Sequence, residues 1–358
     1  MTLVVDCLNG SVMYRLRQGL RALSVVCCLL LFGCSESPPT LYQLHGETMG
    51  TTWSVKMTGL PLAADIDSTR ADIEVLLASI NTQMSTYQED SLISRYNHAE
   101  VGSWHPLPAD FWRVLRYSLS LAELTGGAFD PTIGPLVNLW GFGPESVDGP
   151  PDSAAQQAAL ARVGWQRVRL DSSQRAVQQP GELYLDLSAT AKGYAVDKVS
   201  DWLAQRGVPA ALVEIGGELR AFGVKADGQP WRVAIEAAAV GRREVAEVIS
   251  LTDMAVATSG DYRNFHLQQG RRRSHLIDPR RGEPVTHGIV SVTVLDAECL
   301  VADGLATAFS VLDPDEGLAL ATAEDLAVRW VIADEQGELM TQLSPKFAGY
   351  LAANAANE

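Results

Sequence analysis

The sequence predicts a single α+β domain, in which helices pack on a largely antiparallel sheet. Most of the expected strands are short and are separated by Gly or polar turns, a pattern that favours antiparallel pairing. Segments with helical spacing of apolar residues are interspersed among these strands, and no internal repeat divides the chain. The 358 residues are 47% hydrophobic, which is ample for one large core.

The N-terminal residues resemble a bacterial lipoprotein signal. Three arginines precede an apolar run, LSVVCCLLLFG, which is short for a bilayer span, and Cys34 follows directly. We therefore expect a lipoprotein signal peptide over residues 1–34, with Met13 as an alternative true start, and lipidation of Cys34. An uncleaved anchor is the other interpretation. Residues 35–44 then form a polar tether.

Charge and cysteine content limit the partners and the cross-links. The net charge of -15 argues against nucleic acid, and against an anionic membrane face, because both attract clustered Lys and Arg. Four of the five cysteines lie within residues 1–34, which leaves Cys299 alone in the folded part. No intrachain disulfide is expected, so the domain depends on its apolar core.

The helices of the folded part, expected over residues 45–350, are predicted from apolar spacing and from end signals. In the first, Ile73 and Ile80 share one apolar face, and a Thr-Gly-Gly sequence ends the second. An Asp-Pro pair starts the last through its cap and its first-turn proline. The expected helices cover residues 70–80, 109–124, 152–163, 188–206 and 301–312, and one more begins at Asp313.

The strands are predicted from short alternating or apolar runs between turn residues. Residues 126–143 hold too many Gly and Pro residues for regular structure but are apolar, so we expect them to line a pocket or to cover a core edge. One strand begins at Trp53, and the others cover residues 166–170, 184–187, 211–215, 220–224, 231–235, 247–251, 254–258, 289–295, 328–333 and 339–343.

The stretch LYLDLSATAKGYAVDKV is the element around which the chain is organised. It predicts a strand that runs directly into a helix capped by Ser188. This corner brings together Asp186, the carbonyl groups around Ala189, and Lys192. A carboxylate and a lysine beside free helix N–H groups suit a nucleotide or another anion, with a hard metal. A plain capped corner with a surface lysine is the alternative.

Four further polar clusters could carry chemistry: LVEIGGEL, ATSGDYRNF, SHLIDPRRGEPV and VADGLATAF. In the third, His275 is the best candidate for a general base, because imidazole titrates near neutral pH. In the fourth, Asp303 and Thr307 lie four residues apart on one helical face, so they could share an oxygen-seeking cation, Mg²⁺ before Zn²⁺. Turns, a structural histidine and a buried helix are the alternatives.

The sequence contains no Walker-type loop, no GxGxxG fingerprint after a strand, no GxSxG elbow and no HExxH motif. Taken in order, the clusters together with MGTTW, MSTYQEDSLISRYN and GGAFDPTIGPLVNLWGFG resemble the ApbE family of exported flavin transferases. The resemblance implies one flavin transferase domain over residues 45–350, with a T-fold-like architecture. It also implies that the protein, with Mg²⁺, splits FAD, attaches FMN to a threonine of a target protein as a phosphoester, and releases AMP.

The same resemblance assigns the site residues. It implies that the metal is held by the Ala189 backbone carbonyl, the Asp303 carboxylate and the Thr307 hydroxyl. His275 would take the proton from the acceptor threonine, and Asp303 would be the second catalytic residue. The residues implied to bind FAD are Met49, Tyr87, Ala128, Phe129, Asp130, Asp186, Lys192 and Val290.

Two other functions are compatible with these residues. An FAD pyrophosphatase would hand FMN to water at the same site, and a lipoprotein could bind FAD without chemistry. For the transferase, the resemblance implies an acceptor flavoprotein that is a subunit of a respiratory membrane complex. We expect the protein on the periplasmic side of a bacterial envelope, lipid-anchored at the inner membrane.

Overall fold

The computed structural model describes residues 41–144, 149–236, 245–260, 265–268, 271–334 and 336–355. The expected signal peptide over residues 1–34, the lipidated Cys34 and the first part of the tether lie outside these ranges. Among the described residues, no helix has the length and apolar character that crossing a membrane requires.

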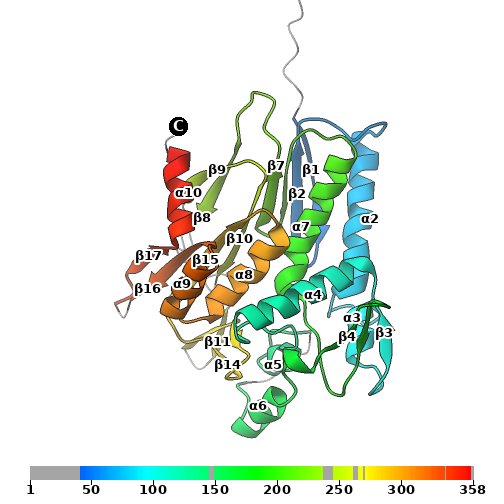
Figure 1. Ribbon diagram of the computed structural model, residues 1–358, viewed down its shortest axis with the longest axis vertical. Helices are drawn as coiled ribbons and strands as arrows, with labels where there is room; N and C mark the ends of the chain where they lie inside the picture. The colour runs from blue at the N-terminus through cyan, green and yellow to red at the C-terminus, as the bar shows by residue number, and fades with distance from the viewer. Residues whose placement is uncertain are drawn as a thin grey trace, which may run out of the picture. The chain divides into compact units, whose positions relative to one another are not determined.

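An eight-stranded, fully antiparallel sheet forms the centre of the fold (Figure 1), which confirms the predicted α+β class. Its strands alternate in burial, so that Ala211, Val213 and Ile215 of one strand all point into the same core. In spatial order the strands are β1 (Tyr42–Thr48), β2 (Thr51–Met57), β6 (Ala211–Ile215), β7 (Glu218–Phe222), β10 (Met254–Gly260), β15 (Ile289–Asp296), β16 (Ala327–Ala333) and β17 (Leu339–Leu343).

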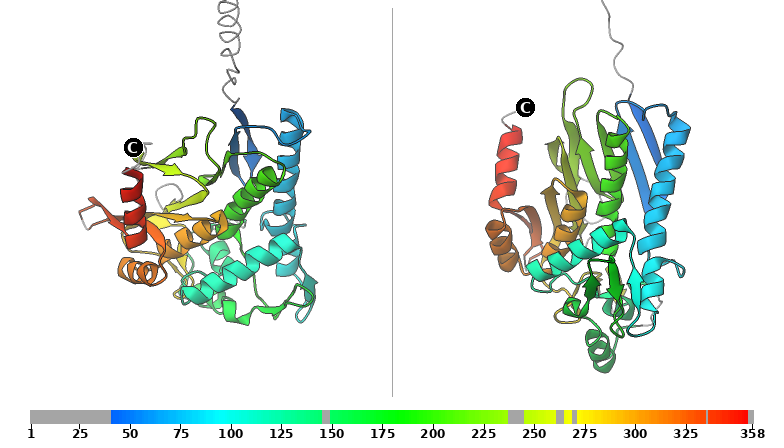
Figure 2. Two further views of the ribbon diagram at one scale, coloured as in Figure 1. Left: turned by 45° about the horizontal axis from the view of Figure 1, so that its top comes forward. Right: turned by 45° about the vertical axis from the view of Figure 1, so that its right-hand side comes forward.

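Helices cover one face of this sheet (Figures 1 and 2). α7 packs on β6 and β7, α8 packs on β10 and β15, and the two helices contact each other. Their buried side chains join those of the sheet in two apolar clusters. The helices on this side are α2 (Ile66–Met84), α4 (Ala109–Leu124), α7 (Ser188–Gln205), α8 (Cys299–Val311) and α9 (Pro314–Ala323).

The opposite face is covered by a separate hairpin and the C-terminal helix. The hairpin consists of β8 (Trp231–Glu236) and β9 (Val245–Leu251), and the helix is α10 (Pro345–Ala355). Trp231 and Phe347 from these elements pack with Leu219 of the sheet in a third apolar cluster. The middle of the sheet is therefore covered on both faces, with the helical layer on one side and the hairpin and α10 on the other.

The remaining elements are short and gather below α4 in the view of Figure 1. Among them α5 lies within the segment that we expected to be irregular, because Pro135 at its first turn is compatible with a helix start. They are α3 (Leu92–Asn97), β3 (Trp104–Pro106), α5 (Gly134–Leu139), α6 (Ser153–Leu160), the 3-10 helix η1 (Trp165–Arg167), β4 (Arg169–Asp171), β5 (Ala176–Gln178), β11 (Phe265–Gln268), β12 (Arg271–Ser274), β13 (Ile277–Asp278) and β14 (Glu283–Pro284).

Several predicted boundaries differ from the structure. The strand predicted at residues 184–187 is wrong, because this extended segment pairs with no strand of the described chain. Its backbone bonds elsewhere: the Leu185 N–H donates to the Asn97 side chain at 2.7 Å, and the Asp186 N–H to the Pro131 carbonyl at 2.8 Å. The predicted strand at 166–170 begins instead with η1. Among the described residues, the first strand starts at Tyr42 and the last helix, α10, ends at Ala355.

Candidate active site

A cavity of about 1170 Å³ opens where β7 begins and β10 ends. Most of the expected site residues line this cavity, although they come from distant parts of the chain. They are Met49, Tyr87, Ala128, Phe129, Asp130, Asp186, Ala189, Lys192, His275, Asp303 and Thr307. Val290 does not line the cavity, and it lies at a register irregularity of β15.

The N-terminus of α7 faces this cavity, but its cap differs from the prediction. Ser188 is the first residue of the helix rather than its cap, so its side chain does not cap it. Instead, the Asp186 carboxylate accepts a hydrogen bond from the Ser188 N–H at 2.9 Å. A carboxylate at the positive end of a helix is electrostatically favourable, so Asp186 stabilises the turn that carries Ala189.

Close contact between α7 and α8 places the Asp303 carboxylate. The backbone N–H of Gly193 donates to Asp303 Oδ2 at 2.9 Å. A Cβ atom at residue 193 would collide with the Cys299 carbonyl oxygen and would lie 2.7 Å from Asp303 Cβ, so glycine is required for this approach. A regular helix directs the same N–H at the Ala189 carbonyl oxygen. The Asp303 carboxylate and the Ala189 carbonyl oxygen therefore compete for the same donor, the Gly193 N–H.

Asp303 is almost fully buried, with 3% of its surface exposed. Burial raises the pKa of Asp303 to about 7; Lys192 opposes this shift and Glu218 adds to it. A buried carboxylate of this kind gains most from a bound cation, because the cation offsets the cost of desolvation.

Thr307 lies one helical turn beyond Asp303, and its hydroxyl lies 3.2 Å from the Ser259 hydroxyl. The Asp303 carboxylate, the Thr307 hydroxyl and the Ala189 carbonyl belong to residues that line one cavity, and as a donor set these hard oxygens would fit Mg²⁺ better than Zn²⁺. The described part of the chain contains no group of three or more His, Cys, Asp or Glu residues that could hold a metal.

The β1–β2 turn and the loop after α2 form another wall of the cavity. Met49 occupies the left-handed region, with φ of 50°, and Gly50 follows with φ of 69°. This tight turn brings Met49 to the cavity. Tyr87 is 65% exposed, and its hydroxyl donates to the Phe142 carbonyl at 3.2 Å. Partial desolvation of the phenol and the nearby Asp186 carboxylate together raise the pKa of Tyr87.

Asp130 lines the cavity, yet its carboxylate is used by the protein itself. Oδ1 accepts from the Thr132 N–H at 2.8 Å and from the Thr132 hydroxyl at 2.7 Å, and Oδ2 accepts from the Trp165 N–H at 3.0 Å. Burial raises its pKa, and these hydrogen bonds oppose the shift. Asp130 thus fixes the loop that carries Phe129.

His275 follows β12, and its ring meets Phe142 edge-on at a centroid distance of 6.3 Å. The ring lines the same cavity as Asp303 and Thr307. In the neighbouring cluster ATSGDYRNF, Ser259 and Gly260 also line the cavity, while residues 261–264 lie outside the described ranges.

Sequence reasoning missed Glu218. Its side chain forms an ion pair with Lys192, with 2.7 Å between Oε1 and Nζ. Burial disfavours charge on Lys192, but Asp303 and Glu218 outweigh it and raise the pKa of the lysine. The prediction for the IGGEL cluster concerned its two glycines. They form the β6–β7 turn, with φ values of 62° and 108°. The charged residue directly after a glycine pair was the available signal.

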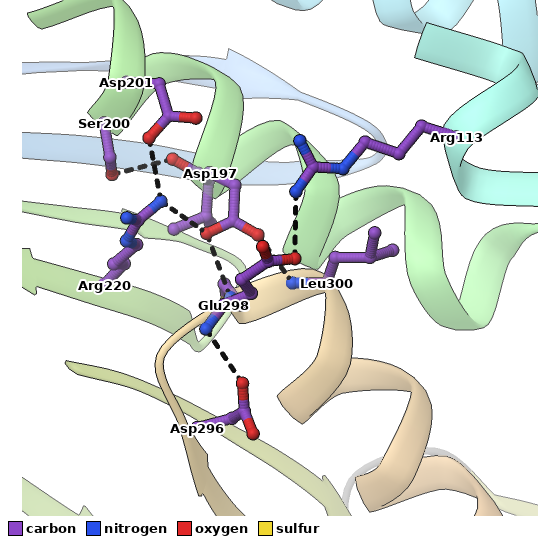
Figure 3. A network of polar contacts seen from close by, with 10 residues as sticks. Arg113, Asp197, Ser200, Asp201, Arg220, Asp296, Glu298 and Leu300 are labelled. Carbon is purple, nitrogen blue, oxygen red and sulfur yellow. Dashed lines mark hydrogen bonds and ion pairs between the residues drawn. The ribbon is translucent and has the colours of Figure 1, made fainter. Parts of the chain in front are cut away.

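A network of polar contacts anchors the start of α8 (Figure 3). The Asp197 carboxylate of α7 accepts the N–H groups of Cys299 at 2.9 Å and of Leu300 at 2.8 Å. It also accepts from Arg220 of β7 at 3.0 Å. These contacts fix α8, and with it Asp303, against α7 and the sheet.

The chain is similar to proteins of one family along most of its length. Residues 49–330 match the ApbE family. The FAD:protein FMN transferase of Vibrio cholerae is 44% identical over 310 residues, which cover 86% of this chain and 92% of that protein. That of Haemophilus influenzae is 39% identical over 334 residues, which cover 91% of this chain and 95% of that protein.

Solved structures agree with the sequence comparison. The apo crystal structure of the flavinyl transferase ApbE from Pseudomonas stutzeri has a TM-score of 0.79 at 38% identity, and the match covers 88% of this chain and 98% of that one. The flavin transferase ApbE from Vibrio cholerae has a TM-score of 0.80 at 41% identity, over 87% of this chain and 100% of that one. The predicted resemblance is confirmed, and the chain belongs to the ApbE family.

Proposed function

We propose that this chain is an Mg²⁺-dependent FAD:protein FMN transferase, which attaches FMN from FAD to a threonine of a target flavoprotein through a phosphoester bond and releases AMP. The names of the similar proteins support the transferase activity. The observation that carries the mechanism is the convergence of Ala189, Lys192, His275, Asp303 and Thr307 on one cavity.

Three of these residues would hold the cation, through the Ala189 carbonyl, the Asp303 carboxylate and the Thr307 hydroxyl. When bound, Mg²⁺ supplies Lewis-acid stabilisation of charge on a transferring phosphoryl group. Lys192, held charged by its acidic neighbours, places a second positive charge in the same cavity. An anionic pyrophosphate would therefore meet two cations in a cavity that is otherwise rich in carboxylates.

His275 would accept the proton from the hydroxyl of the acceptor threonine. The threonine oxygen forms a bond to the FMN phosphorus while the bond from that phosphorus to the AMP phosphate oxygen breaks, and AMP leaves. The proton passes from the threonine hydroxyl to the imidazole ring, which acts as the general base. The edge-on contact with Phe142 holds the ring at the cavity wall.

The location of the protein belongs to the same proposal. A lipidated Cys34 would anchor the domain on the periplasmic side of the inner membrane, where an acceptor subunit of a respiratory complex is accessible. Labelling with a radioactive fatty acid tests the anchor: the wild-type chain should take up label, and Cys34→Ala should not. Equal labelling of the two would contradict it.

One incubation separates the three candidate functions. The detergent-solubilised full chain is mixed with FAD, Mg²⁺ and a threonine-bearing fragment of a respiratory flavoprotein, and AMP and the acceptor mass are followed. An acceptor that gains one FMN, with matching AMP, supports the transferase. AMP and free FMN with an unmodified acceptor would favour the pyrophosphatase. FAD that stays intact in every condition would favour a binding protein.

A further inference from the structure

Glu218 is the buried partner of an ion pair at the cavity wall. It is the first residue of β7, and its side chain is 6% exposed. Oε1 lies 2.7 Å from Lys192 Nζ, so the pair joins the sheet to the first turns of α7. Both residues line the cavity that contains Asp303.

The second oxygen of this carboxylate has no protein partner. Oε2 is buried and accepts no hydrogen bond from any residue that the structure describes. Leaving a buried charged oxygen unsatisfied is costly, and a buried ion pair contributes little net stability of its own. A gain in stability therefore does not explain why a glutamate occupies this position, whereas its ion pair with Lys192 points to a role in placing the lysine.

Lys192 has two carboxylates within its electrostatic reach, but it pairs with only one of them. Both Asp303 and Glu218 raise the pKa of the lysine. Within the described ranges, the ion pair of Lys192 is with Glu218, and none joins Lys192 to Asp303 within 4.0 Å. Asp303 is instead held by the Gly193 N–H at 2.9 Å.

We propose that Glu218 is a positioning residue, which holds Lys192 away from Asp303 and so keeps the Asp303 carboxylate free to bind a divalent cation. The inference rests on the metal site of the proposed function. Without the charge on Glu218, the ammonium of Lys192 turns to the remaining carboxylate and competes with the cation. Glu218 thereby separates two positive charges, one on the lysine and one on the metal, that both act on an anionic substrate.

The test measures cation binding rather than activity. Mn²⁺ alone is titrated into the detergent-solubilised full chain without FAD, and free Mn²⁺ is followed by electron paramagnetic resonance. Glu218→Gln should weaken Mn²⁺ binding about tenfold. That loss is expected if Lys192 then pairs with Asp303 for about nine tenths of the time and the cation can bind only in the remaining tenth. Lys192→Met alone should not weaken it. The double variant Glu218→Gln/Lys192→Met should recover the affinity of Lys192→Met.

The recovery distinguishes positioning from a merely structural role, because removal of a lysine does not repair a misfolded site. Glu214→Gln is the matched control: it changes another cavity carboxylate, which accepts from Ser54 and Gly217 instead of from Lys192, and should leave Mn²⁺ affinity unchanged. Glu218→Asp provides a second variant should the glutamine variant fold poorly, with a smaller loss that Lys192→Met again removes.

The outcomes separate this inference from the proposed function. Wild-type affinity in Glu218→Gln would overturn the positioning role and leave the metal site intact. A double variant as weak as Glu218→Gln would also overturn it, because Glu218 would then act as a ligand or as a structural residue. A wild-type chain that binds no Mn²⁺ would overturn the metal site itself, and this inference with it.

Discussion

The backbone N–H of Gly193 donates to the Asp303 carboxylate at 2.9 Å, which joins the two helices that carry the proposed metal ligands. Ala189 lies one turn before Gly193 on α7, and Thr307 lies one turn after Asp303 on α8. The site geometry therefore depends on how closely these helices cross.

The crossing predicts a strong effect for Gly193→Ala. The added methyl group would meet the Cys299 carbonyl and Asp303 Cβ, so the helices must separate. We expect a loss of about 1–3 kcal/mol in the free energy of unfolding, the usual range for overpacking, together with weaker Mg²⁺ binding. Chemical denaturation and calorimetric Mg²⁺ titration measure the two effects.

The control for this variant is Gly349→Ala in α10, where an added Cβ meets nothing within 4 Å. That substitution should be neutral or should stabilise the helix at this exposed position by up to about 1 kcal/mol, because alanine favours helices over glycine. Unchanged stability and Mg²⁺ affinity in Gly193→Ala would contradict the tight crossing.

The pH dependence of Mg²⁺ binding should report on Asp303. Burial raises the pKa of this residue to about 7, with Lys192 opposing the shift. Below that pH a proton competes with the cation for the carboxylate. We expect the Mg²⁺ dissociation constant to rise by up to about tenfold per pH unit as the pH falls below about 7, and to level off above it.

The same raised pKa has the opposite sign for stability in the metal-free protein. The unfolded chain releases the Asp303 proton near its ordinary pKa of about 4, so this group's contribution to stability falls as the pH rises from there to about 7.

The control for the pH dependence of Mg²⁺ binding is Thr307→Ala. This variant should weaken Mg²⁺ binding at every pH and keep the same change of affinity with pH. A pH-independent Mg²⁺ affinity would exclude Asp303 as the competing group.

Much of the fold follows from periodicity, and its errors have physical reasons. Leu183, Leu185 and Leu187 alternate in the sequence and are all buried, but their backbone pairs with no strand of the described chain. Alternation reports which side chains are buried, whereas the partner of the backbone is decided by tertiary structure. The predicted strand failed on the second point only.

Sequence motifs predicted which residues would gather at the cavity but not the contacts between them. The cavity collects Asp186, Lys192 and Asp303 as expected, because each lies in a recognisable cluster. The pairing of Lys192 with Glu218 could not be predicted, since it depends on which face of β7 meets α7. Likewise, the sequence could not predict that the Asp130 carboxylate, which lines the cavity as expected, also binds Thr132 and the backbone of Trp165.

His275→Ala should reduce flavin transfer and leave binding intact. Removal of a general base lowers the rate by about 10²–10⁴-fold, while the metal ligands and the FAD-facing residues are unchanged. Single-turnover transfer, measured by acceptor mass, should fall accordingly, and FAD and Mg²⁺ affinities should stay within about twofold of wild type. His45→Ala, at an exposed position of β1, should behave as wild type throughout. Undiminished transfer by His275→Ala would remove the base role.

Asp197 and Asp201 allow a matched test of the α8 anchor, because both accept from the same Arg220 nitrogen at 3.0 Å. Asp197 also binds the first N–H groups of α8 and is buried, whereas the Asp201 side chain is 46% exposed. Asp197→Ala should cost about 3–5 kcal/mol, since it leaves buried partners unpaired, and Asp201→Ala less than about 1 kcal/mol. Denaturant unfolding measures both.

The two variants should also differ at the metal site. When α8 loses its anchor, Asp303 and Thr307 shift relative to Ala189, so Mg²⁺ affinity should fall in Asp197→Ala. It should hold in Asp201→Ala, because the start of α8 keeps its acceptor. Equal Mg²⁺ affinities in the two folded variants would show that the ion-pair network of Figure 3 supports the fold without setting the position of the ligands.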